Sequence, residues 1–141
     1  MNFSLEEIRN KLSEKGLKVT PQRLTILDAI YKLGGHPTVD KIIEYVRKSS
    51  PNIASGTVYK TLDTLIENNL VKRVTTDKDV MRYDGNINKH HHLYCTECDV
   101  IEDYIDEELD TLLKVYFSNK KIKDFDIKDF VLQIKGTFNK C

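Results

Sequence analysis

The chain has 141 residues, enough for one ordinary domain or two small ones, and its 40% hydrophobic and 31% charged residues describe a globular protein in water. It contains neither an apolar run long enough to cross a bilayer nor a signal-peptide core, so we expect a cytoplasmic protein with no membrane partner. The net charge is zero, but Lys and Arg outnumber Asp and Glu by 14 to 11 in residues 1–84, and the remaining residues have 8 against 11. This asymmetry indicates that the two halves have different tasks.

The first half predicts four amphipathic helices. Ser4 and Glu7 form a capping box for the first helix, Thr20 caps the second, Thr38 caps the third, and the fourth starts at Ser55. Helical spacing predicts that the buried faces comprise Leu5, Ile8 and Leu12, then Leu24, Leu27, Ile30 and Tyr31, then Ile42, Ile43 and Val46, and finally Val58, Leu62, Leu65 and Ile66.

The fourth helix turns a polar face to solvent and is followed by a predicted hairpin. Two short β-rich runs, 71–76 and 80–84, come after it. Helices followed by a two-stranded hairpin are the plan of a winged helix-turn-helix, in which the last helix enters the major groove of DNA. The side chains expected to face solvent on this helix are Thr57, Tyr59, Lys60 and Thr61.

The second half begins after a polar, glycine-containing connector, which divides the chain into domains at 1–84 and 89–141 with a hinge at 85–88. We expect two strands in 89–104, a helix over 106–118 and a last strand over 130–135, and therefore an α+β protein. The inward residues of that helix are predicted to be Leu109, Leu112, Leu113 and Tyr116. Because so small a sheet with one helix buries little surface, we expect a homodimer.

The segment KHHHLYCTECDVIEDY, residues 89–104, concentrates metal-binding side chains. In a strand, a period of two places His90 and His92 on one face and His91 on the other, and paired imidazoles suit zinc, iron or nickel. Cys95 and Cys98 have the C-x-x-C spacing with which two thiolates clamp one ion. The same spacing also occurs in redox motifs, although the βαβ context of thioredoxin-like proteins is missing here.

With these residues in view, the chain resembles the ferric uptake regulator family of metal-dependent bacterial repressors, and most closely its peroxide-sensing branch. The matching blocks are GLKVTPQRLTIL, HPTVDKI, TVYKTLDTLIENNLV, RYD, HHHLYCTEC and DVIEDY, in the order and spacing of the family. The resemblance implies an N-terminal winged-helix DNA-binding domain and a C-terminal metal-binding dimerisation domain.

The resemblance also implies two sets of functional residues. Fe(II) or Mn(II) would bind a regulatory site made of His36, Asp84, His90, His92 and Asp103. The iron-sensing branch usually carries glutamate at the two aspartate positions, so the pair favours peroxide sensing, with His36 or His90 as the oxidised ligand. The residues expected to contact an inverted-repeat operator in double-stranded DNA are Lys18, Thr57, Tyr59, Lys60 and Arg73.

The sequence departs from the family pattern at two places. The structural zinc site of the family has two C-x-x-C pairs, but Phe138 stands where the third cysteine belongs, so Cys95, Cys98 and Cys141 form an incomplete site for Zn(II). Three outcomes remain open: the site is lost, three thiolates hold zinc with a different fourth ligand, or Cys141 is a free thiol. In addition, Phe130 replaces a histidine and His91 replaces an aspartate, which argues against a second regulatory site.

Three other functions remain as alternatives. A regulator of iron or zinc uptake would share the fold and the ligands but report metal supply without peroxide chemistry. A mononuclear metalloenzyme would need an open coordination position beside a substrate pocket. A DNA-binding module with a purely structural metal would bind its operator even after mild chelation.

Overall fold

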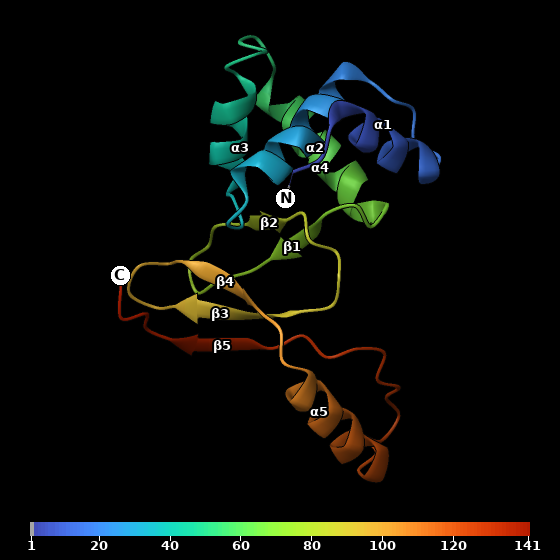
Figure 1. Cartoon of the computed structure of the whole chain (residues 1–141), viewed down its shortest axis with the longest axis vertical. Helices are drawn as coiled ribbons and strands as arrows, with labels where there is room; N and C mark the ends of the chain where they lie inside the picture. Colours follow the sequence, from blue (N-terminus) through green and yellow to red (C-terminus); the bar gives the residue numbers. More distant parts are fainter. Residues whose placement is uncertain (1) are drawn as a thin grey trace. The chain divides into compact units, whose positions relative to one another are not determined.

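The computed structural model describes residues 2–141, which divide into two compact units between Ile87 and Asn88 (Figure 1). This division lies inside the segment 85–88 that the sequence suggests as a hinge. Among the residues that the structure describes, no helix is long and apolar enough to cross a membrane.

The first unit consists of four helices followed by a two-stranded antiparallel hairpin (Figure 1). The elements are α1 (Leu5–Glu14), α2 (Pro21–Leu33), α3 (Val39–Val46), α4 (Ser55–Glu67), β1 (Lys72–Val74) and β2 (Arg82–Asp84). In the hairpin, Arg73 pairs with Tyr83 at the centre of the register. The predicted order of helices and hairpin is confirmed.

Three of the helix starts are fixed by the caps that the sequence predicts. Ser4 and Glu7 make both bonds of the capping box, and the side chains of Thr20 and Thr38 accept the backbone N–H groups of Arg23 and Lys41. The fourth helix starts at Ser55, as predicted, but its cap residue makes no side-chain hydrogen bond.

One hydrophobic core joins the four helices of the first unit. Its fully buried members include Ile8, Leu12, Ile26, Leu27, Ile42, Val46, Val58, Leu62 and Leu65. Two predictions about this core are wrong: Leu5 is 61% exposed, and Thr61 is buried, with its hydroxyl donating to the Thr57 carbonyl oxygen at 2.8 Å. Helical spacing predicts which side chains share a face of a helix. It does not predict how wide a face the neighbouring elements bury, or at which residue along the helix this packing ends.

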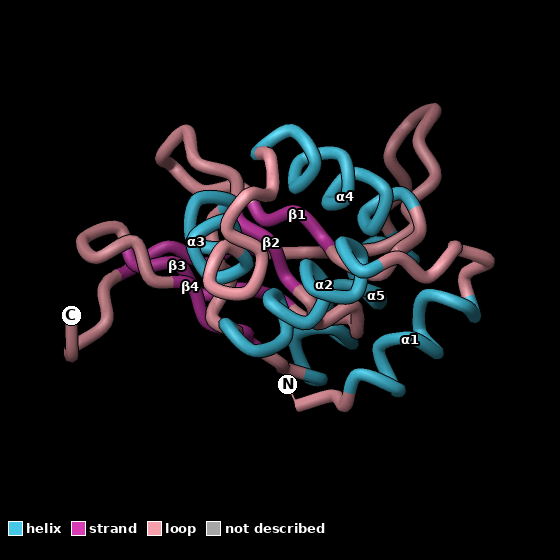
Figure 2. The backbone as a smooth tube through the Cα atoms, turned by 90° about the horizontal axis from the view of Figure 1, so that it is seen from above, coloured by secondary structure: helices cyan, strands magenta, loops and turns pink. Residues whose placement is uncertain are grey.

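The second unit is a three-stranded sheet with one helix. Its elements are β3 (His91–Cys95), β4 (Ile101–Tyr104), α5 (Glu107–Asn119) and β5 (Gln133–Gly136). The central strand β3 pairs with β4 in antiparallel and with β5 in parallel orientation, and Figure 2 shows the strands in magenta and the helices in cyan. The last strand starts at Gln133, three residues later than 130–135 predicts.

The helix α5 corrects half of the prediction about its inward side chains. Leu109 and Leu113 are partly buried, but Leu112 and Tyr116 are 67% and 51% exposed, and none of the residues of α5, all of which the structure describes, is fully buried. The sequence pattern marks an apolar face, but the sheet of a single chain is too small to cover it.

Candidate metal centre and DNA-binding surface

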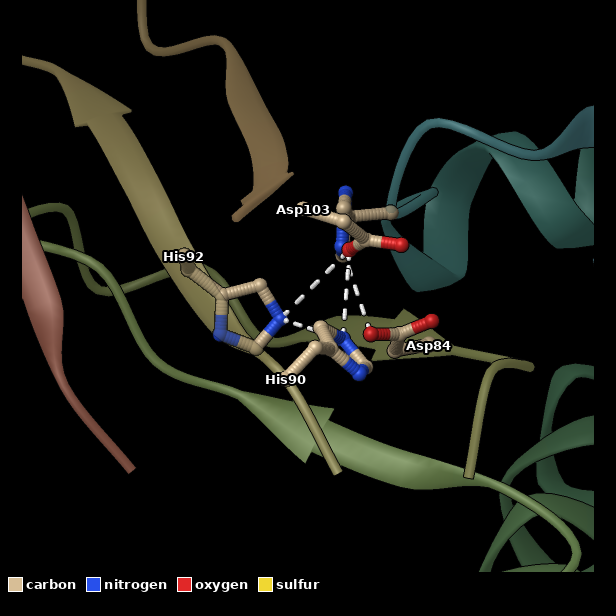
Figure 3. Close-up of side chains that lie close together, drawn as sticks. Asp84, His90, His92 and Asp103 are labelled. Carbon is tan, nitrogen blue, oxygen red and sulfur yellow. Dashed lines mark hydrogen bonds and ion pairs between the residues drawn. The ribbon is translucent and has the colours of Figure 1, made fainter. Parts of the chain in front are cut away.

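His90 and His92 present their imidazoles on the same side of the chain at the start of β3, as the period of two predicts. Their Nε2 atoms are 3.1 Å apart, and both side chains are buried. Asp103 lies opposite His92 on β4, and its Oδ1 is 3.2 Å from Nε2 of His90 and 3.8 Å from Nε2 of His92. Figure 3 shows how these three side chains converge from the two neighbouring strands.

A backbone contact fixes the orientation of the His90 ring. Its Nδ1 lies 2.5 Å from the carbonyl oxygen of Asn88, so the ring donates Nδ1–H there, and the neutral form of the ring directs the lone pair of Nε2 toward His92 and Asp103. Histidines that bind metals commonly use the second ring nitrogen in this way, which sets the tautomer and aims the ligand atom.

The donor set fits a divalent transition metal. Two nitrogens bound to one ion at about 2.1 Å, with roughly a right angle between the bonds, lie about 3 Å apart, and the observed separation is 3.1 Å. Two histidines and one carboxylate that leave other positions open are the set that non-haem Fe(II) prefers. Zinc accepts the same donors, so the set alone does not select the metal.

In the first unit, His36 and Asp84 form a second buried pair. Nε2 of His36 is 3.3 Å from Oδ2 of Asp84, and both side chains are less than a tenth exposed. The backbone holds this pair, because the Arg82 guanidinium donates to the carbonyl oxygen of His36 and the Tyr83 N–H donates to that of Pro37. The Asp84 carboxylate also accepts the backbone N–H of Asn86 at 2.8 Å.

The three cysteines come together in the second unit. Their sulfur atoms lie within 4.8 Å of one another; Cys98 and Cys141 form a disulfide, and Sγ of Cys95 is 3.0 Å from Sγ of Cys141. Cys141 therefore lies beside the other two cysteines. Burial acts to raise the pKa of Cys95, but backbone N–H groups, that of Cys98 foremost, outweigh it and lower the pKa. In the reduced state, three thiolates at this spacing fit zinc, which would need a fourth ligand from outside the set.

The residues predicted to contact DNA differ in their surroundings. Tyr59 is 47% exposed, Lys60 and Lys18 are also exposed, and Thr57 is partly buried. Arg73 donates to Asp63 of α4 at 2.7 Å, an interaction that sequence reasoning missed. Both side chains of this ion pair are about half exposed, and exposed ion pairs contribute little to the free energy of folding. A phosphate group can therefore replace Asp63 as the partner of the Arg73 guanidinium with little loss of stability.

Sequence reasoning also missed the partner of His91. The side chain points away from His90 and His92, as the period predicts, and its Nε2 is 2.6 Å from Oδ1 of Asp110 on α5. An acidic residue in the first turn of a helix is ordinary, so the sequence carries no signal that singles out Asp110.

A winged helix-turn-helix unit joined to a small unit with histidine and carboxylate donors defines a metal-responsive regulator of transcription. The chain belongs to the ferric uptake regulator family, whose sequence model matches residues 14–134. Members of this family regulate transcription and are not enzymes, so the metalloenzyme alternative is excluded.

Proteins similar to this chain include repressors that respond to peroxide. The peroxide-responsive repressor PerR of Staphylococcus epidermidis is 29% identical over the whole chain and 92% of its own length, and PerR of Staphylococcus aureus strain Mu50 is 30% identical over the whole chain and 93% of its length. The peroxide stress regulator of Campylobacter jejuni has a TM-score of 0.71 at 27% identity, with full coverage of both chains.

Other solved structures share the fold alone. The Helicobacter pylori ferric uptake regulator Fur, which has three functional metal binding sites, has a TM-score of 0.82 at 23% identity and covers all of this chain and 97% of its own. A zinc uptake regulator complexed with zinc and DNA has a TM-score of 0.71 at 19% identity, covering 97% of this chain and 91% of its own. The fold is therefore common to regulators that use different metals.

Proposed function

We propose that this chain is a dimeric repressor that binds an inverted-repeat operator while Fe(II) or Mn(II) occupies its regulatory site, and that hydrogen peroxide releases it by oxidising a ligand histidine. The observation that carries the proposal is the convergence of His90, His92 and Asp103 on one point in the second unit. The peroxide-responsive relatives support the choice of signal.

In this proposal the regulatory site takes donors from both units. His90, His92 and Asp103 hold the ion from the sheet, while His36 and Asp84 complete its coordination from the winged-helix unit. The ion would then favour one relative orientation of the two units. In the dimer each chain contributes one recognition helix, α4, and the two helices fit successive turns of the duplex only when they have the correct spacing. Bound iron supplies the redox chemistry with peroxide, and the chain supplies the histidine, His36 or His90, that gains an oxygen atom.

The operator would be read by α4. Tyr59 and Lys60 extend from the exposed face of the helix near its N-terminus, and the tyrosine ring suits thymine methyl groups while the lysine suits guanine acceptors or phosphate. Lys18 and Arg73 would contact the backbone of the duplex and hold the helix in register.

The dimer would form through α5. Leu112, Val115 and Tyr116 are all more than half exposed and line a groove of about 1000 Å³ along the helix. A surface of this composition is what a homodimer interface buries. Analytical ultracentrifugation of Leu112→Glu should show a monomer. Leu5→Glu is the matched control, because Leu5 is exposed to a similar extent on α1 and should leave the dimer intact.

The test of function is operator binding measured by fluorescence anisotropy without oxygen. The probe is a duplex selected from random-sequence DNA by the Mn(II)-loaded protein, and binding is compared for the Fe(II) and Mn(II) forms before and after a small excess of hydrogen peroxide. We expect the iron form alone to lose binding, with one added oxygen on the peptide that contains His36 or His90. Binding that survives peroxide in both forms would instead favour a regulator of metal supply.

The metal-supply function is the second candidate, because zinc accepts the same donors and similar folds serve zinc and manganese regulators. It predicts that operator affinity follows the concentration of free metal and that peroxide has no effect. Chelation separates both candidates from a module with a purely structural metal, whose DNA binding would survive a chelator.

A further inference from the structure

His91 has both of its ring nitrogens engaged inside the second unit. The residue is 1% exposed, Nδ1 accepts the backbone N–H of Leu132 at 3.0 Å, and Nε2 lies 2.6 Å from Oδ1 of Asp110. Because Nδ1 accepts a hydrogen bond, the ring carries its proton on Nε2 and donates it to the carboxylate. The imidazole therefore has no lone pair left for a metal ion.

These two hydrogen bonds join three separate segments of the chain. His91 belongs to β3, Asp110 to α5, and Leu132 to the residues that lead into β5. The next residue of β3 strengthens the same junction, because the backbone N–H of His92 donates to the Leu132 carbonyl oxygen at 3.0 Å. The strand that carries His90 and His92 is thus fixed to the helix and to the last strand at one point.

A cation and an aromatic pair extend this junction. Nζ of Lys89 is 3.1 Å from Oδ1 of Asp129 and 5.9 Å from the centre of the Phe130 ring, which stacks on Phe117 of α5 at 5.3 Å. Phe130 offers no ligand atom, and the Asp129 carboxylate is paired with the ammonium group of Lys89. His91 and Phe130 are the two positions where the sequence departs from the pattern for a second regulatory site.

We propose that this junction, consisting of His91, Asp110, Lys89, Asp129, Phe130 and Phe117, is a metal-free bridge in place of a second regulatory metal, and that His91 and Asp110 are positioning residues for the regulatory site. The bridge holds α5 against β3 without an ion, so the geometry of His90 and His92 does not depend on a second metal. The role assigned to the regulatory site rests on the proposed function, whereas the metal-free character of the bridge does not.

The test compares three variants of the full-length chain. Asp110→Ala removes the acceptor, Asp110→Asn keeps a neutral oxygen that accepts Nε2–H but is a poor metal ligand, and Lys114→Ala is a control at an exposed position of α5. Mn(II) affinity and stoichiometry are measured by titration calorimetry, and long-range nitrogen NMR of the metal-free protein reports the tautomer of His91. We expect Asp110→Ala to weaken Mn(II) binding by up to about tenfold, the lower end of the effect of partners that contact a ligand directly, because Asp110 acts on His90 and His92 only through His91. Asp110→Asn and Lys114→Ala should keep the affinity and stoichiometry of the parent.

Three results would overturn the proposal. Loss of a Mn(II) equivalent in Asp110→Asn would make Asp110 a metal ligand. Unchanged Mn(II) affinity in Asp110→Ala would remove the positioning role, and a proton on Nδ1 of His91 in the metal-free protein would contradict the bridge. If the parent chain binds no Mn(II), the proposed function fails, and the tautomer measurement still decides whether the bridge exists.

Discussion

His36 adopts a backbone φ of 59°, in the left-handed region that residues other than glycine seldom occupy. Gly34 and Gly35 precede it with φ of 56° and 57°, so three consecutive residues have a positive φ. Such a conformation costs about 1–3 kcal/mol at a non-glycine residue and persists only where the surroundings impose it. Here the hydrogen bonds from Arg82 and Tyr83 impose it, and the backbone aims the imidazole at Asp84.

Gly85 follows Asp84 and lies against Tyr31, where no larger residue fits. A Cβ atom at this position would be 2.9 Å from Cδ1 and 3.0 Å from Cε1 of the Tyr31 ring, and 3.3 Å from Cγ2 of Ile30. We expect Gly85→Ala to lower the free energy of unfolding by about 1–3 kcal/mol in urea titrations. Gly56→Ala is the matched control, because a Cβ there meets nothing within 4 Å and the helix α4 gains propensity. Equal effects at both positions would contradict the close contact.

The phenol group of Tyr31 makes the free energy of unfolding depend on pH in the alkaline range. Burial raises its pKa from 10.0 to about 12, so the folded state holds the phenolic proton more tightly than the unfolded state. The stabilisation is complete below the unfolded pKa of 10.0 and is lost as the pH rises through the folded pKa of about 12. Tyr31→Phe keeps the ring and cannot ionise, so its free energy of unfolding should fall less over this range. Parallel slopes for the two proteins in urea titrations would contradict the assignment.

At the scale of the elements, the sequence predicts what depends on neighbours along the chain and misses what depends on distant ones. The caps at Ser4, Thr20 and Thr38 are local hydrogen bonds, and the strand period places His90 and His92 together without knowledge of the sheet. The exposed face of α5 and the pairing of His91 with Asp110 depend on packing, which neither spacing nor composition records.

Asp106 makes the start of α5 sensitive to acid. Its carboxylate accepts the Leu109 N–H and the Tyr104 hydroxyl, and these two hydrogen bonds, the first foremost, hold its pKa below the ordinary value of 3.8. The resulting stabilisation is present above that value and is lost as the pH falls through the lower, folded pKa. Asp106→Asn still caps the helix but does not titrate there. Circular dichroism should therefore show a shallower acid loss of helix for this variant, and identical acid curves would rule out the contribution.

For the whole molecule, the regulatory ion is predicted to act as a link between the two compact units. Mn(II) at a hundredfold excess over its dissociation constant should raise the free energy of unfolding by about 2.7 kcal/mol. If the ion takes ligands from both units, His36→Ala and His92→Ala should each abolish most of this gain, whereas the exposed Glu44→Ala should keep it. A gain that His92→Ala removes and His36→Ala leaves intact would confine the site to the second unit.

Three successive histidines serve opposite sides of one strand: His90 and His92 converge with Asp103, and His91 bonds to Asp110. A deletion or insertion of one residue beside them would turn every side chain to the other face. It would leave one imidazole where two now converge with Asp103, while the histidine run would still present an imidazole toward Asp110. We therefore expect this run to tolerate exchanges of side chains far better than changes in length, so that evolution or engineering can retune the metal here by substitution but not by insertion or deletion.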